Sequence, residues 1–148
     1  MKVPQHPFRF GVMNELALPP QEWLSHVRQI EEYGFDSFLI RDHFVADFFG
    51  EQYAPLTAMM AAAMATTRLR VGSMVIDNDY RHPIVLAKEI ATIDALSGGR
   101  VELGLGAGWL QREYELLGIP FDANGVRVSR LEEAIKIIKG VFESPPFS

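Results

Sequence analysis

Side chains that can exchange protons or bind a ligand gather directly after four short apolar segments of this chain. They stand at Met13-Asn14-Glu15, at Arg41-Asp42-His43-Phe44, from Asp77 to His82, and at Ala107-Gly108-Trp109. Imidazole and carboxylate groups are common general acids and bases, and aromatic side chains stack on flat rings. If the four segments are parallel strands, their carboxyl ends meet at one edge, which is then the predicted active face.

The pair Asp42-His43 carries the strongest indication of acid–base chemistry. A histidine at the end of a strand can gain or lose a proton near neutral pH. A neighbouring carboxylate can orient the ring or raise its pKa, although adjacent residues of an extended strand point to opposite sides. The alternative interpretation is a surface loop in which His43 lies beside a solvated Asp42.

The oxygen-rich stretch Asp77-Asn78-Asp79 raises the question of a metal ion, because hard cations prefer oxygen ligands. It lacks the glycine and the distal glutamate of a calcium-binding loop, so we expect no metal site. A polar turn is the favoured interpretation, and a ligand-facing Asp77 is the second.

Residues 104–109 read GLGAGW, a glycine-rich stretch at the end of a predicted strand. It is not a dinucleotide fingerprint, because G-x-G-x-x-G requires a glycine where Trp109 stands. Glycines without a Cβ let a flat ring or a phosphate approach the backbone, or let two strands pack tightly, and both interpretations stay open. Trp109 could stack on a ring or close the rim of the fold.

The composition is that of an ordinary globular chain and excludes several classes of function. The 148 residues are 48% hydrophobic and 22% charged, with a net charge of −5 and no cysteine. We expect no disulfide and no cysteine nucleophile, no nucleic-acid or membrane partner, and a cytoplasmic location. Motifs of serine hydrolases, zinc proteases and nucleotide triphosphatases are absent, so those reactions lack support.

Four segments bounded by Gly, Pro or Asp are predicted as strands, at 8–13, 36–40, 70–76 and 101–106. They lie about 30 residues apart, the length of one strand-plus-helix unit. Apolar residues at helical spacing predict three helices. Their apolar positions are Trp23, Val27 and Ile30; Leu86, Ile90 and Ile93; and Leu131, Ala134, Ile135, Ile138, Val141 and Phe142.

Helix boundaries and two further segments complete the pattern. Gly98-Gly99 stops the second of these helices and Pro145-Pro146 ends the third. The polar stretch from Gln111 to Leu117 predicts a short surface excursion. The apolar run at 58–65 is far shorter than the roughly 20 residues of a membrane span, so a helix packed on several sides is expected.

Alternating strands and helices predict an α/β fold with a parallel sheet. Two architectures remain open on this pattern: a doubly wound sheet, or consecutive βα units of a TIM-type (β/α)8 barrel. No linker, low-complexity segment or charge block divides residues 1–148.

Five stretches resemble the bacterial luciferase-like family, above all its branch that uses the deazaflavin coenzyme F-420 (F420). They are FRFGV at 8–12, GFDS at 34–37 leading to Asp42-His43-Phe44, LSGGRVELGLGAGW at 96–109, Glu113, and LGIPF at 117–121. The resemblance implies four consecutive βα units of a (β/α)8 barrel, that is, a half barrel. It also implies an oxidoreductase that transfers a hydride between F420 and a small organic substrate, with an FMN-dependent monooxygenase as the alternative.

The same resemblance implies roles for particular residues. His43 is the expected proton donor or acceptor beside the ring, with Asp42 next to it at the cofactor edge. Met74-Val75 falls where the family often has a non-prolyl cis peptide behind the ring, and Asp77 where members often contact the ring. The stretch Gly106-Ala107-Gly108-Trp109 is expected to line the ring and the start of the ribityl chain.

A family barrel has eight βα units and roughly 250 residues, so residues 1–148 are expected to be its N-terminal half. With the C-terminal half absent, we expect the chain to be incomplete and inactive alone. Its inner face would be apolar, with Phe10, Phe38 or Leu39, and Leu103 or Leu105. Two copies could pair as a homodimer through exposed sheet edges or through the Ala/Met-rich helix at 56–66, and a non-catalytic flavin-binding protein is the remaining alternative.

Overall fold

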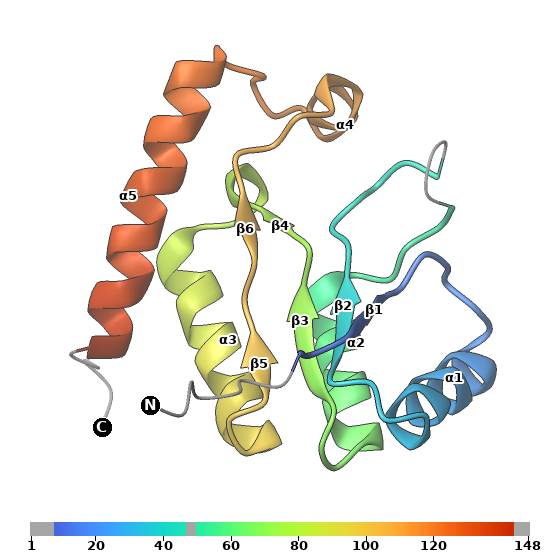
Figure 1. Cartoon of the computed structure of the whole chain (residues 1–148). Helices are drawn as coiled ribbons and strands as arrows, with labels where there is room; N and C mark the ends of the chain where they lie inside the picture. Colours follow the sequence, from blue (N-terminus) through green and yellow to red (C-terminus); the bar gives the residue numbers. More distant parts are fainter. Residues whose placement is uncertain (1–7, 47–49, 144–148) are drawn as a thin grey trace.

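The computed structural model describes residues 8–46 and 50–143, which form an alternating series of strands and helices (Figure 1). In chain order the elements are β1 (Gly11–Met13), α1 (Pro20–Glu32), β2 (Ser37–Ile40), α2 (Pro55–Ala65), β3 (Arg70–Ser73), β4 (Ile76–Asp77), the 3-10 helix η1 (Asn78–Tyr80), α3 (Pro83–Ser97), β5 (Val101–Glu102), β6 (Leu105–Gly106), α4 (Gln111–Leu117) and α5 (Asn124–Glu143). The predicted α/β class is confirmed.

All the strands of the described residues pair in parallel. One sheet has the order β1-β2-β3-β5, and β4 pairs with β6 beyond it. The strands predicted at 70–76 and 101–106 are therefore each divided in two. The first division falls at Met74-Val75, whose peptide bond is cis, as the family resemblance implies. Parallel neighbours in sequence order, joined by helices, are the βα units of a half barrel.

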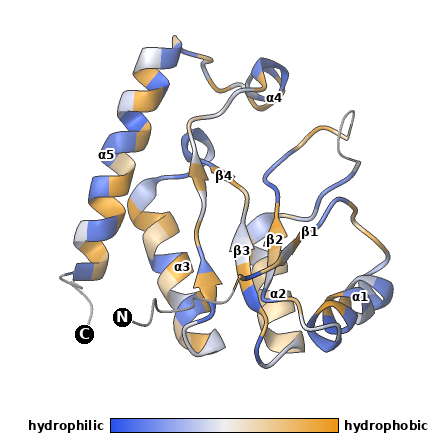
Figure 2. Ribbon diagram, in the orientation of Figure 1, coloured by the Kyte–Doolittle hydropathy of each residue, from blue (hydrophilic) through white to orange (hydrophobic). Residues whose placement is uncertain are grey.

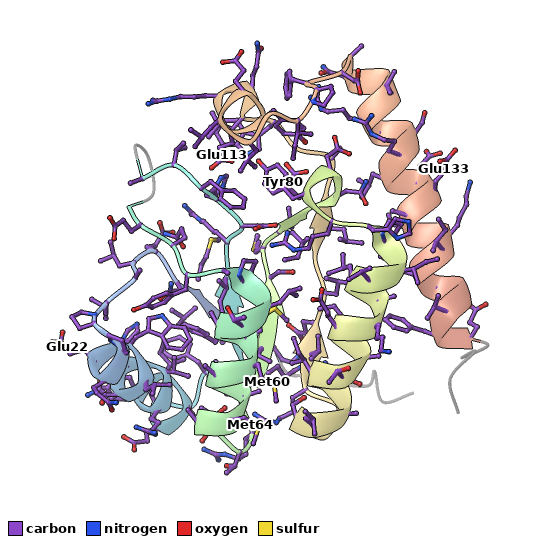
Figure 3. All side chains as sticks on the ribbon, turned by 180° about the vertical axis from the view of Figure 1, so that it is seen from behind. Glu22, Met60, Met64, Tyr80, Glu113 and Glu133 are labelled. Carbon is purple, nitrogen blue, oxygen red and sulfur yellow. The ribbon has the colours of Figure 1, made fainter. Side chains whose placement is uncertain are left out.

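The helices that cover the sheet lie on one of its faces. α2 and α3 stand behind the strands in Figure 1 and in front of them in Figure 3, which is turned by 180°. The register partners Phe38 and Val71 are fully buried, and the Phe38 ring meets that of Trp23 of α1 edge-on at 5.6 Å. The core therefore lies between the sheet and the helices.

The predicted helices form where apolar residues recur on one side. Trp23, Val27 and Ile30 are the buried residues of α1, which begins with a proline in its first turn. Leu86, Ile90 and Ile93 are buried on α3, and Gly98 closes that helix in the left-handed conformation at φ +73°. Spacing and capping signals thus placed α1 and α3 correctly.

The helix predicted from the apolar stripe at 131–142 is α5, whereas one prediction beside it needs correction. In α5 the buried residues of the stripe are Ala134 and Ile138, Val141 packs partly buried against the core, and Phe142 is exposed. Figure 2 shows apolar and polar residues alternating along α5. The predicted stop at Pro145-Pro146 lies outside the described residues. The segment Gln111–Leu117 is not a surface excursion but the helix α4, whose Glu113 and Tyr114 are buried.

The open face of the sheet is more polar than the sequence suggested. Phe10 precedes β1 and is 67% exposed, and Phe38 points to the helix side. Of the predicted alternatives, Leu39 is therefore the residue on the open face, beside Gly72, whereas Leu103 and Leu105 pack partly buried against the core. The open face also carries an ion pair in which Arg70 Nε lies 2.6 Å from Glu102 Oε1, and Arg9 reaches the same oxygen at 3.4 Å. Strand residues alternate between faces, and only the register decides which set faces the helices.

Within residues 8–46 and 50–143, none of the helices combines the length and apolar character that crossing a membrane requires.

Glycine at position 104 is required by a close approach of two backbones. A Cβ there would lie 2.4 Å from the carbonyl oxygen of Ser73. We expect Gly104→Ala to lower the free energy of unfolding by about 1–3 kcal/mol, because the strand backbones must separate. Denaturant unfolding followed by circular dichroism measures this change.

The control is Gly140→Ala in α5, where an added Cβ meets no atom within 4 Å. An alanine inside a helix is expected to raise the unfolding free energy there by about 0.5–1 kcal/mol. A Gly104→Ala chain as stable as the original would contradict the close packing.

Candidate functional site

A histidine–carboxylate pair joins two loops that are far apart in sequence. His43 follows β2, and its Nδ1 lies 3.0 Å from Glu113 Oε2 and 3.2 Å from Oε1. The Glu113 side chain is on α4 and is 1% exposed, whereas that of His43 retains some exposure. The carboxylate therefore fixes the orientation of the His43 ring through Nδ1.

The buried Glu113 carboxylate has further donors around it. The backbone N–H groups of Phe44 and Val45 donate to Oε1 at 2.7 and 3.1 Å, and the Tyr80 hydroxyl donates to Oε2 at 3.1 Å. Figure 3 shows Glu113 and Tyr80 close together beneath α4. Burial by itself would raise the pKa of Glu113, but the hydrogen bonds from His43, Val45 and Phe44 outweigh it and the pKa is lowered.

Asp42 has a different partner from that of His43, its neighbour in the loop after β2. Arg81 Nη2 donates to Asp42 Oδ1 at 3.0 Å and Arg81 Nη1 donates to Oδ2, which also accepts the Asp77 N–H at 3.1 Å. Asp42 is buried, so this bidentate pair supplies its counter-charge. The pair connects the end of β2 to β4 and to the residue after η1. The predicted contact of Asp42 with a cofactor edge stays a prediction.

A second buried cluster surrounds Asp77 at the end of β4. The Tyr114 hydroxyl lies 3.0 Å from both carboxylate oxygens of Asp77, and the Asp79 N–H donates to Asp77 Oδ1 at 2.9 Å. Burial raises the pKa of Asp77, and these hydrogen bonds offset only part of that effect. Burial and the charges of Asp77 and Glu113 also raise the pKa of Tyr80, so its hydroxyl stays a proton donor.

Apolar side chains next to these clusters remain open to solvent. Met74 and Val75, joined by the cis peptide, are exposed, and Trp109 is 61% exposed. The rings of Trp109 and His43 meet edge-on with centroids 6.1 Å apart. The structure thus brings His43 and Trp109 together and leaves Met74-Val75 beside Gly106, where an added Cβ would lie 2.6 Å from Val75 Cγ2.

Nearby protein atoms leave no space for a side chain at positions 104, 106 and 108. Added Cβ atoms at Gly104 and Gly106 would meet Ser73 and Val75, and one at Gly108 would lie 1.8 Å from the Tyr114 hydroxyl oxygen. Gly108 also has φ +74°, which side chains other than glycine rarely adopt. Tight packing is therefore observed at all three positions, and their predicted contact with a ring stays a prediction.

Sequence reasoning missed much of the polar framework. Glu113 entered only as part of the family resemblance, and Tyr80, Arg81 and Tyr114 received no role. Their signal is faint, since a charged residue in a short polar segment is usually solvated. Among the described residues there is no group of three or more metal-ligating side chains that could hold a metal ion.

The comparisons with known proteins define the class. Residues 5–148 match the luciferase-like monooxygenase family, to which the chain belongs. An F420-dependent glucose-6-phosphate dehydrogenase of Amycolatopsis mediterranei is 34% identical over 84% of this chain. An FMNH(2)-dependent dimethylsulfone monooxygenase of Pseudomonas putida is 31% identical over 80% of this chain.

A solved structure extends the similarity to three dimensions. An F420-dependent secondary alcohol dehydrogenase, in complex with an F420-acetone adduct, superposes with a TM-score of 0.81 and 25% identity over 93% of this chain. The aligned regions cover 38% of the glucose-6-phosphate dehydrogenase, 32% of the sulfone monooxygenase and 42% of the alcohol dehydrogenase. The chain therefore spans less than half the length of these relatives.

The lowered pKa of Glu113 makes stability depend on pH with a definite sign. A carboxyl whose pKa is lower in the folded state stabilises the fold above its unfolded pKa, and that stabilisation is lost as the pH falls through the folded value. The ordinary value is 4.5. Glu113→Gln should therefore cost about 2–4 kcal/mol at pH 7, and the gap to the original chain should narrow below about pH 4.5, as urea unfolding at pH 3–7 would measure.

Asp77, whose pKa is raised, acts with the opposite sign, but it is present in both proteins and cancels in the comparison. The exposed Glu115→Gln of the same helix serves as the control. A stability gap between the original chain and Glu113→Gln that stays constant down to pH 3 would contradict the ionised, hydrogen-bonded Glu113.

Proposed function

We propose that this chain is the ring-binding half of an F420-dependent oxidoreductase, in which His43 handles the proton that accompanies hydride transfer to or from a small organic substrate. The observation that carries the proposal is the buried Glu113 carboxylate holding His43 Nδ1 at 3.0 Å, directly beside the exposed Trp109. Membership of the family, with F420-dependent relatives at 34% identity, supports the same assignment.

The residues present fit a flat, partly apolar ring. Met74, Val75 and Trp109 offer exposed apolar surface at the carboxyl ends of the strands, and Gly104 and Gly106 leave room for the Val75 side chain. A bound deazaflavin would supply the two-electron chemistry, because its ring carries the hydride. Asp42 and Asp77 are proposed to shape the polar edge of this site.

The protein's part in the proposed reaction is to position the ring and to move one proton. Glu113 keeps Nδ1 of His43 at its carboxylate, and Nε2 is the proposed atom that gives or takes the proton. Tyr80 remains protonated and keeps donating to Glu113, so the carboxylate retains its orientation in both states of His43. The pair Asp42–Arg81 holds the two flanking loops at a fixed separation.

The alternative function is an FMN-dependent monooxygenase of the same family, which the sulfone monooxygenase relative favours. Both cofactors present a flat ring, and the described residues supply ring contacts common to the two. A cytoplasmic location and the absence of nucleic-acid partners stay predictions of the sequence. A direct measurement of binding therefore distinguishes F420 from FMN as the cofactor.

We expect the 148-residue chain to bind F420 more tightly than FMN, and Trp109→Ala to weaken F420 binding about three- to ten-fold, because it removes an aromatic contact. Quenching of deazaflavin fluorescence measures binding, and loss of the F420 absorbance in the presence of alcohol or sugar phosphate substrates measures turnover. Because the 148-residue chain is expected to be inactive alone, turnover is measured on the longer protein that would include the remaining βα units, where His43→Gln should lower it about 100-fold or more while binding is kept.

Phe142→Ala, an exposed aromatic residue of α5 away from the site, is the matched control. Tighter binding of FMN than of F420 would favour the monooxygenase. Failure of both cofactors to bind the chain would overturn the proposal, and unchanged turnover in His43→Gln would remove His43 from the reaction.

We also propose that residues 1–148 form the N-terminal half of a barrel. Further βα units would then cover the open face of the sheet and contribute the rest of the substrate site. The face without helices and the partial coverage of the relatives support this. A second copy is the proposed partner on the helix side, where α2 exposes Ala61 and Met64; Figure 3 shows Met60 and Met64 on this helix.

We expect two copies to associate through α2, and a charge placed on this helix should break the homodimer. We expect the chain to sediment as a dimer at micromolar concentration, and Met64→Glu to weaken the association at least ten-fold by burying a charge. Leu116→Glu, an equally exposed position on α4, is the control. A monomeric original chain would contradict both proposed surfaces, and a dimer indifferent to Met64→Glu would assign the contact to the sheet edges.

A further inference from the structure

Behind the turn that carries Trp109 lies Arg127, an arginine that makes no hydrogen bond to a carboxylate within the described residues. Arg127 is in the first turns of α5 and is only 6% exposed. Its guanidinium donates to the carbonyl oxygens of Ala107 at 3.2 Å and Gly108 at 3.4 Å, and to Asn124 Oδ1 at 3.0 Å. The carbonyl of Asp122 accepts a further hydrogen bond from it.

The surroundings of this cation are unusual for a buried charge. Among the described residues no carboxylate oxygen accepts a hydrogen bond from Arg127; the Asp122 carboxylate is bonded to Arg130. The guanidinium carbon instead lies 3.8 Å from the centre of the Phe121 ring. Buried charges are normally paired with opposite charges, so a positive charge held only by neutral dipoles polarises the backbone that surrounds it.

Because peptide groups are planar, these contacts fix the direction of the neighbouring backbone N–H groups. In a trans peptide the C=O and the following N–H point to opposite sides. With the carbonyls of Ala107 and Gly108 held by Arg127, the N–H groups of Gly108 and Trp109 point away from α5. None of the hydrogen bonds found among the described residues is donated by the Gly108 N–H.

We infer that Arg127 is a positioning residue that orients the 107–109 turn as a cradle in which a backbone N–H donates to a bound oxygen atom. The Gly108 N–H, polarised by the cation behind it, binds an oxygen atom of the cofactor, either a ring carbonyl or a phosphate of the side chain. This inference rests on the proposed function, which assigns a deazaflavin or flavin to this edge. It adds a residue from α5, outside all four predicted strand ends, to the site.

Two-dimensional 1H–15N NMR of the full 148-residue chain tests the inference. FMN and riboflavin, which share a ring but differ by a phosphate, are titrated into the original chain, Arg127→Gln, Arg127→Lys and the control Lys136→Gln, an exposed position of the same helix. We expect both ligands to shift the Gly108 and Trp109 amide resonances. Arg127→Gln should weaken flavin binding about ten-fold, and Arg127→Lys should restore part of it, because the charge remains.

The outcomes separate the two claims. Equal weakening of FMN and riboflavin in Arg127→Gln assigns the ring carbonyl, and weakening of FMN alone assigns the phosphate. Flavin binding that leaves both amides unshifted, or that is indifferent to Arg127→Gln, overturns the cradle. Failure of either flavin, and of F420, to bind the original chain overturns the proposed function and the cradle with it. The amide shifts caused by Arg127→Gln without ligand then still decide whether Arg127 holds the turn.

Discussion

The site depends on satisfying one buried carboxylate. Glu113 is 1% exposed and accepts hydrogen bonds from a ring nitrogen, two backbone N–H groups and a phenol. A carboxylate deprived of these donors in such a place costs several kcal/mol. The loop after β2, the 3-10 helix after β4 and the helix α4 must therefore meet at a single point, and His43 is fixed as a consequence.

Close backbone approach is the second constraint, and it works through glycine. Gly104 and Gly106 allow the strand ends β5 and β6 to lie against Ser73 and Val75, and Gly108 leaves space for the Tyr114 hydroxyl. These contacts bring the exposed Met74-Val75 segment and Trp109 to the same edge as the buried polar groups. The proposed ring site combines this exposed apolar surface with an imidazole of fixed orientation.

Much of the fold could be predicted from local pattern. Trp23, Val27 and Ile30 repeat at helical spacing and are buried together, because one face of a helix must find a core. The polarity of Gln111–Leu117 was misleading for the opposite reason. A short polar segment is solvated on average. Burial of Glu113 becomes favourable only because hydrogen-bond donors such as the Phe44 N–H lie next to its carboxylate.

By itself, the sequence determined the α/β class, the order of the βα units and the clustering of His43, Asp77 and Trp109 at the carboxyl ends of strands, since periodicity and parallel topology suffice for these. Only the tertiary structure decided that Glu113 rather than Asp42 holds His43, and that Arg127 stands behind the 107–109 turn. Such partners lie tens of residues apart, and no local sequence pattern predicts hydrogen bonds between residues so far apart.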